Sequence, residues 1–254
     1  MYKSIKMELK SLYKEYPLES GKKFETLQNI NMSISKGTFI SIIGPSGCGK
    51  STLFNIISGL ESPTSGEVFL NGDIIINKKG LVSYMPQKDY LLPWRSVLDN
   101  IILGMEIKGI KRKEAREIAR NYLEPFGLEG FENELPSSLS GGMRQRAALL
   151  RTILLKNDVL LLDEPFGALD EITRIYMQQW LLGIWEKYRH TIVFVTHSID
   201  EAIFLSDIVY VLSPRPARIK YKMEVNLPRP RQSKMMTEKN FSDYKKKLFD
   251  ELTN

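Results

Sequence analysis

The chain has 254 residues, 43% of them hydrophobic, and a formal net charge of +6 at pH 7. This length suits one large α/β domain, or a core with a smaller lobe, and excludes two such domains in tandem. No apolar run approaches the roughly 18 residues of a membrane-spanning helix. The N-terminus lacks the apolar stretch of a signal peptide, and the single cysteine excludes an intrachain disulfide. We therefore expect the chain to stay in the cytosol.

The basic excess fits either a solvated surface or a location near an anionic membrane leaflet. Lysines and arginines are scattered along the chain, with a modest cluster at residues 245–247. A nucleic-acid-binding surface needs a basic stripe with interleaved aromatic residues. The chain has no such stripe, so we expect no nucleic-acid partner.

The N-terminal third predicts strands followed by a phosphate-binding loop. Residues 1–43 alternate apolar and polar side chains between turn signals, which favours antiparallel strands, and residues 39–43 form a buried strand. The pattern Gly, four residues, Gly-Lys-Ser follows, and residues 50–58 are typical of a helix. A strand, a glycine-rich loop and a helix N-terminus in this order are typical of a nucleotide-binding P-loop.

Each residue type in this loop has a physical role. Glycine allows positive φ and close approach of the backbone, so that successive N–H groups can point at one anion. Lys50 adds a charge for the β- and γ-phosphates, and the Ser51 hydroxyl can bind Mg²⁺. Cys48 is interpreted as a small spacer. The residues expected to bind the nucleotide here are Gly44, Pro45, Ser46, Gly47, Cys48, Gly49, Lys50, Ser51 and Thr52.

The rest of the chain divides into three stretches. Residues 95–155 have helical spacing and many charges, which predicts a helical lobe inserted into the core. Strand, helix and strand then alternate over residues 159–212, as in a parallel sheet. The tail from residue 213 is rich in Pro, Arg and Lys and ends in a short helix. Its apolar stripe should dock on the chain's own domain and consists of Phe241, Tyr244, Leu248 and Leu252.

Two carboxylates follow the apolar run at residues 159–162. A buried strand that ends in Asp163 places this side chain at the carboxyl edge of the sheet, where phosphates bind in open α/β folds. Asp163 can hold Mg²⁺ through water, and Glu164 can polarise the water that attacks a γ-phosphate. An exposed Asp-Glu turn is the alternative interpretation, but the P-loop upstream disfavours it.

A second anion site is predicted at residues 139–146, Leu-Ser-Gly-Gly-Met-Arg-Gln-Arg. Ser140, Gly141 and Gly142 precede a helix expected over residues 143–155, so a hydroxyl and a helix N-terminus lie together. One triphosphate already fills the P-loop, so this second site would serve a nucleotide held by another copy of the chain. The alternative is an ordinary helix N-cap provided by Ser140.

These motifs, in this order, resemble the ATP-binding subunits of ABC transporters over about residues 5–230. The resemblance implies an α/β fold, with a P-loop NTPase (RecA-like) core, an N-terminal antiparallel β-subdomain and an inserted helical subdomain. The implied ATPase domain spans residues 1–230, with its core at 1–94 and 156–230 and the helical subdomain at about 95–155. Residues 231–254 would form a basic tail with a short helix.

The resemblance also assigns roles to four further residues. Gln87 looks like the Q-loop glutamine that contacts Mg²⁺ or the attacking water, and Asp170 resembles the D-loop aspartate. His197 looks like the switch histidine that contacts the γ-phosphate. Tyr16 matches the aromatic residue that stacks on adenine; Phe24 competes for this role and is otherwise expected in the core.

The mechanism implied by the resemblance is hydrolysis of ATP with Mg²⁺. Lys50 would hold phosphates, Glu164 would act as general base, and Ser140 and Gly142 of a second copy would close the site of a head-to-tail dimer. The implied partners are two transmembrane permease subunits and, through them, an extracytoplasmic solute-binding protein. The chain would then lie peripherally on the cytoplasmic face of the plasma (inner) membrane.

Three sequence segments, at residues 91–95, 213–219 and 227–231, resemble those of the nitrate/sulfonate/taurine group of importer ATPases. This group includes transporters of thiamine-precursor pyrimidines. Ala217 stands where that group often has Gly. The alternative is a soluble ABC-type ATPase that acts on nucleic acid or the ribosome. Such proteins carry long coiled coils or two cassettes, whereas only about ninety residues without heptads separate Lys50 from Ser140. A non-hydrolysing regulatory cassette would need damaged motifs, and these motifs are intact.

Overall fold

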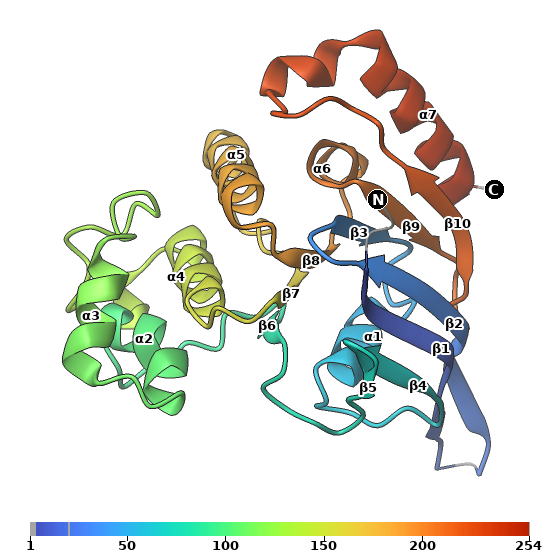
Figure 1. The fold of residues 1–254 in the computed structure, drawn as a ribbon, viewed down its shortest axis with the longest axis horizontal. Helices are drawn as coiled ribbons and strands as arrows, with labels where there is room; N and C mark the ends of the chain where they lie inside the picture. Colours follow the sequence, from blue (N-terminus) through green and yellow to red (C-terminus); the bar gives the residue numbers. More distant parts are fainter. Residues whose placement is uncertain (1–3, 20, 254) are drawn as a thin grey trace.

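The computed structural model describes residues 4–19 and 21–253. A six-stranded sheet forms the centre, a four-stranded antiparallel sheet lies against one side, and a group of helices forms a lobe beyond the β6 edge (Figure 1). The α/β fold predicted from the sequence is confirmed. No helix within the described residues has the length and apolarity needed to cross a membrane.

The six-stranded sheet has the order β10-β9-β3-β8-β7-β6. Five of its strands are parallel, and β10 runs antiparallel to β9. Parallel strands bring their carboxyl ends to one edge of the sheet, where ligands of open α/β folds bind. The bounds are β3 Phe39–Ile43, β6 Ser83–Met85, β7 Val159–Asp163, β8 Thr191–Val195, β9 Ile208–Leu212 and β10 Ile219–Glu224.

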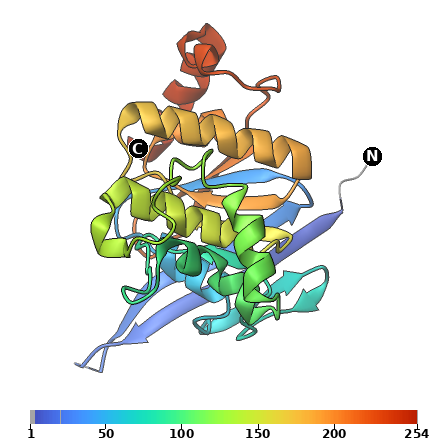
Figure 2. The ribbon, with the colours of Figure 1, turned by 90° about the vertical axis from the view of Figure 1, so that its left-hand side faces the viewer.

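Both faces of this sheet are buried, which explains the near-continuous apolar runs of its strands. Phe39 and Ile43 of β3 pack into a core shared with α4 (Gly141–Ile153), α5 (Glu171–Tyr188) and α6 (Ile199–Leu205). Ile40 and Ile42 point the other way, into a core shared with α1 (Lys50–Ile57) and the antiparallel sheet. In Figure 2, the lobe helices and α5 lie toward the viewer, with the strands behind them.

The antiparallel sheet has the order β2-β1-β4-β5. Its long strands β1 (Ile5–Pro17) and β2 (Lys23–Ser35) form a hairpin, which agrees with the antiparallel strands predicted before the P-loop, and Tyr16 lies opposite Phe24 in it. β4 (Ser65–Leu70) pairs with β1 and with the short β5 (Asp73–Ile74).

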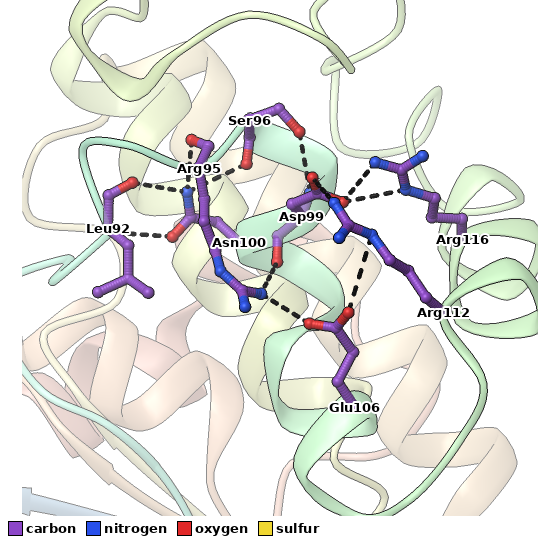
Figure 3. A network of polar contacts seen from close by, with 8 residues as sticks. All are labelled: Leu92, Arg95, Ser96, Asp99, Asn100, Glu106, Arg112 and Arg116. Carbon is purple, nitrogen blue, oxygen red and sulfur yellow. Dashed lines mark hydrogen bonds and ion pairs between the residues drawn. The ribbon is translucent and has the colours of Figure 1, made fainter.

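The helical lobe contains a polar network around α2 (Val97–Ile107; Figure 3). Burial opposes ionisation of Asp99, but hydrogen bonds from Arg116 and Arg112 outweigh it and lower the pKa of this carboxyl. Asn100 is fully buried, donates to three backbone carbonyls and accepts from the N–H of Leu92. The lobe consists of α2 Val97–Ile107, α3 Arg112–Arg120, the 3₁₀ turn Pro136–Ser138 and α4 Gly141–Ile153.

The C-terminal helix α7 (Lys239–Thr253) docks on the chain's own domain, as its apolar stripe predicts. Phe241 and Leu248 are buried, and α7 packs against α6 and β9. The tail is also fixed by Arg231, whose guanidinium is buried and donates to three carbonyls at the end of α6. Burial lowers the pKa of Arg231 to about 10.

Truncation of Leu248 should test this docking. Leu248→Ala should lower the free energy of unfolding by about 2–4 kcal/mol, because it removes a fully buried side chain and leaves a cavity. Urea titration followed by circular dichroism measures the change. Phe249→Ala is the matched control on the same helix; its side chain is 56% exposed, so its effect should stay within about 0.5 kcal/mol. Equal effects of the two variants would contradict the docking.

Candidate nucleotide site

A cavity of about 310 Å³ opens at the carboxyl edge of the six-stranded sheet. The loops that follow β3, β6, β7, β8 and β9 all reach it, because these strands are parallel. The residues that line it are Ser46, Gly47, Gly49, Lys50, Ser51, Thr52, Gln87, Glu164, His197 and Arg215.

The glycine-rich loop after β3 has the backbone that its sequence predicts. Gly47 and Gly49 have φ of 73° and 125°, a region that favours glycine. A Cβ atom on Gly49 would lie 2.9 Å from a methyl carbon of Leu27, so the position also requires close approach. Cys48 is buried, and burial raises the pKa of its thiol. A buried thiol of raised pKa fits the spacer that we expect and not a nucleophile.

Lys50 begins α1 and is 6% exposed. Its ammonium donates to the carbonyls of Gly44 and Pro45, at 2.9 and 3.0 Å. Within the described residues, no carboxylate lies within ion-pair distance of it. A buried cation that has neutral acceptors only is suited to an anionic ligand.

Ser51 and Asp163 meet at the carboxyl edge of the sheet, beside this cavity. The Ser51 hydroxyl donates to Asp163 Oδ2 at 2.9 Å, although the two residues are 112 positions apart. Burial raises the pKa of Asp163, and the hydrogen bond from Ser51 opposes this shift. A hydroxyl, a buried carboxylate and the nearby Gln87 amide are oxygen donors of the kind that Mg²⁺ prefers alongside phosphate and water. These residues therefore fit the expected metal.

Glu164 is held at the centre of the site by two predicted residues. His197 Nε2 lies 2.6 Å from Glu164 Oε1, and the Gln87 side chain donates to Glu164 Oε2 at 3.0 Å. The backbone of Glu164 has a φ of 50°, which is uncommon outside glycine and is concentrated at functional sites. Its N–H donates to the carbonyl of Val195, which ties the turn after β7 to β8.

Gln145 is a site residue that sequence reasoning missed. This buried side chain on α4 donates to the Glu164 carbonyl and accepts from the Ala168 N–H, both at 2.8 Å. It therefore bridges the lobe helix and the turn that carries Glu164. The sequence places Gln145 on an expected helix, but this pattern does not distinguish a bridging amide from a solvated one.

The structure does not bring the residues of the second predicted anion site to this cavity. Ser140 caps α4 and accepts from the Met143 N–H at 3.2 Å, and Asp170 likewise caps α5. Within the described chain, neither Ser140 nor Gly141 nor Gly142 lines the 310 Å³ cavity. Gly142 instead packs near Leu169: a Cβ atom added to Gly142 would lie 3.2 Å from a methyl carbon of Leu169.

The two aromatic candidates for base stacking differ in burial. Tyr16 is half-buried, and burial together with the nearby Glu61 carboxylate raises the pKa of its hydroxyl. Phe24 is 39% exposed, so its expected alternative place in the core is wrong. A cation lies over each ring: Lys14 Nζ is 4.7 Å from the centroid of the Tyr16 ring, and the Arg215 guanidinium is 4.5 Å from the centroid of the Phe24 ring.

The chain is similar to known proteins over most of its length. Residues 27–167 match the family model described as ABC transporter. An uncharacterised ABC transporter ATP-binding protein of Methanocaldococcus jannaschii is 44% identical over 246 residues, which cover 97% of this chain and 91% of that protein. The aliphatic sulfonates import ATP-binding protein SsuB of Bacillus cereus is 42% identical over 227 residues, which cover 89% and 88%.

Solved structures agree with this family. A dimeric bacterial ABC transporter cassette superposes with a TM-score of 0.80 at 31% identity and covers 87% of this chain and 100% of its own. A post-hydrolysis state of that cassette, bound to ADP and Pi, matches at 30% identity with the same TM-score. Since the family model spans more than half of the chain and the relatives match over nearly their full length, this chain belongs to the ABC transporter ATP-binding family and is an ATPase cassette.

Proposed function

We propose that the chain is the ATP-hydrolysing subunit of an importer for a small solute, of the nitrate, sulfonate or taurine type or a thiamine-precursor pyrimidine. The observation that carries the hydrolytic role is the Glu164 carboxylate, held between His197 and Gln87 beside the phosphate loop. The importer class is supported by the similarity to SsuB and by the strings after Gln87 and His197. The ATPase domain is proposed to span residues 1–230, with residues 231–254 as its tail.

In the proposed mechanism the side chains place positive charge beside the phosphates and one proton acceptor beside the attacking water. Phosphoryl transfer to water needs mainly such positioning and charge neutralisation. Lys50 and the loop N–H groups bind the β- and γ-phosphates, and Glu164 takes the proton of the attacking water. His197 and Gln87 orient the Glu164 carboxylate through its two oxygens. Ser51, Gln87 and Asp163 would hold Mg²⁺, which neutralises phosphate charge when bound. Tyr16 is proposed to stack on adenine.

The site is proposed to be completed by a second copy of the chain. Ser140, Gly141 and Gly142 begin α4 away from the cavity, so their N–H groups are suited to the nucleotide of the partner. Asp170 caps α5 beside them and would lie at the same interface. The solved relative cassette is dimeric, which supports this head-to-tail arrangement.

The surface beside Gln87 is proposed to receive the membrane subunits. Trp94, Tyr90 and Ile107 are 74%, 63% and 79% exposed. Arg95, which follows Trp94, forms an ion pair of 2.6 Å with Glu106 at the end of α2. Tyr90 also lines a cavity of about 600 Å³ that reaches Gln87 and Asp163. Permease subunits docked here would place the chain on the cytoplasmic face of the membrane, with a solute-binding protein on the opposite side.

Replacement of the proposed base separates binding from chemistry. Glu164→Gln keeps the shape of the side chain but cannot take a proton, so hydrolysis should fall by about 10²–10⁴-fold while ATP still binds. Phosphate release and a fluorescent-nucleotide titration measure the two quantities. Lys50→Ala is the contrasting variant, because it should lose most of the affinity itself. Parent-rate hydrolysis by Glu164→Gln would show that another residue is the base.

Mixing two inactive variants tests the shared site. In a head-to-tail dimer of a Lys50→Ala chain with a Ser140→Arg chain, both lesions fall on one site and the other site is intact. The mixture should regain up to about a quarter of parental activity if copies assort at random and the sites act independently. Neither variant alone should show this activity. If the two sites hydrolyse ATP only together, the mixture would stay inactive, so ATP-induced crosslinking of Ser46→Cys with Ser140→Cys provides a second test. Crosslinks only within one chain would contradict the shared site.

Loss of the exposed indole should weaken docking of the permease. Trp94→Ala should reduce co-purification with co-expressed membrane subunits by several-fold, since exposed aromatic side chains often anchor interfaces. Phe249→Ala is the matched control, because it also removes an exposed aromatic ring, on α7. Thermal melting of the isolated variants shows that both remain folded. Equal co-purification of the two variants would exclude Trp94 from the docking surface.

A further inference from the structure

Arg215 reaches the nucleotide cavity from the loop after β9. Four other parallel strands of the sheet deliver their loops to this cavity, and β9 is the fifth. The Arg215 guanidinium lies over the Phe24 ring and donates to the carbonyl of Gly47 in the phosphate loop. The cation is thus placed at the outer edge of the loop that holds Lys50.

The loop that carries Arg215 is rigidly attached to β2. Ser213 and Arg218 close it with two hydrogen bonds of 3.0 Å, one to the Arg218 carbonyl and one to the Ser213 hydroxyl. Ala217 is fully buried, and its N–H and carbonyl bond to Thr26 and Gln28, each at 2.9 Å. These contacts fix the backbone of the loop, so little further ordering of the backbone at Arg215 is needed when a ligand binds.

Arg215 differs from its neighbours in its partners. Arg218, three residues on, donates to the Gln28 side chain, and Arg229 pairs with Asp207. Within the described residues, Arg215 has no carboxylate within ion-pair distance, and the Gly47 carbonyl is its one hydrogen-bond acceptor. A guanidinium has five N–H donors, so most of those of Arg215 are available. Together with Lys50, it provides a second cation at the cavity that has no carboxylate partner.

We propose that Arg215 is a nucleotide-binding residue that contacts the phosphate chain, and that Phe24 positions its guanidinium. A planar guanidinium is well matched to phosphate oxygens, and stacking on an aromatic ring leaves its N–H edge free to donate. Phe24 therefore supports a cation, while Tyr16 remains the candidate for the base. The proposal rests on the proposed phosphate-binding role of the loop at Lys50, which the experiment tests separately.

The experiment measures dissociation constants of MgATP and MgADP for purified full-length variants by fluorescent-nucleotide titration. Arg215→Ala and Arg215→Gln should each weaken both nucleotides about tenfold, since a charge-assisted contact is lost. Arg215→Lys should weaken them less, because it keeps the charge. Phe24→Leu should give an intermediate loss. Arg218→Ala, which removes a cation from the same loop on its other side, should bind both nucleotides as the parent does.

Thermal melting without nucleotide shows whether each variant is folded, and Lys50→Ala shows whether the phosphate loop binds at all. Parental binding by Lys50→Ala would refute the site as a whole. Lost binding by Lys50→Ala with parental binding by Arg215→Ala would refute the proposal alone. Equal losses in Arg218→Ala and Arg215→Ala would also overturn it, because the loss would then follow from the charge of the loop and not from the contact that Arg215 makes. A loss in Phe24→Leu without one in Arg215→Ala would assign Phe24 to the base instead.

Discussion

The parallel alignment of five strands is the constraint on which the nucleotide site depends. Neighbouring parallel strands end at the same edge of the sheet, so the loops that follow them converge there although they are distant in sequence. Ser51 follows β3 and Asp163 ends β7, yet they hydrogen-bond although β8 lies between their strands. The apolar layers on both faces fix this alignment, because a strand displaced by one residue would exchange the side chains that are packed into its two different cores. Burial of the sheet therefore sets the geometry of the site.

The sequence predicted this architecture because its signals are local. Strands buried on both faces appear as apolar runs, such as residues 191–195, and the phosphate loop is a contiguous motif. Contacts between distant segments left no such signal. The Arg215 contact with Gly47 spans 168 positions, and the two bonds of Gln145 span 19 and 23. The exposure of Phe24 was missed for a related reason: a strand pattern shows which residues alternate, but not which end of a long hairpin extends beyond the core.

Two amide side chains are among the groups that join the helical lobe to the site. Gln145 links α4 to the carbonyl of Glu164, and Asn100 links α2 to the segment that follows Gln87. Both amides are buried, and a buried polar group costs free energy when its partner moves away. A rotation of the lobe must therefore either carry these segments with it or break the bonds. This requirement gives a physical route by which the proposed docking surface at Trp94 and the Glu164 carboxylate would respond to each other.

The distribution of charge in one chain also favours the proposed dimer. The cavity has two cations without carboxylate partners, Lys50 and Arg215, and its fixed carboxylate Glu164 is held by neutral or weakly basic donors. A polyphosphate bound there would meet donors mainly from the phosphate loop, because the first turn of α4 lies elsewhere in the same chain. That turn carries N–H groups and the capping Ser140 and has no acidic residue. Each chain thus has a donor set suited to an anion that it does not itself enclose, and a head-to-tail pairing satisfies both copies with the same contacts.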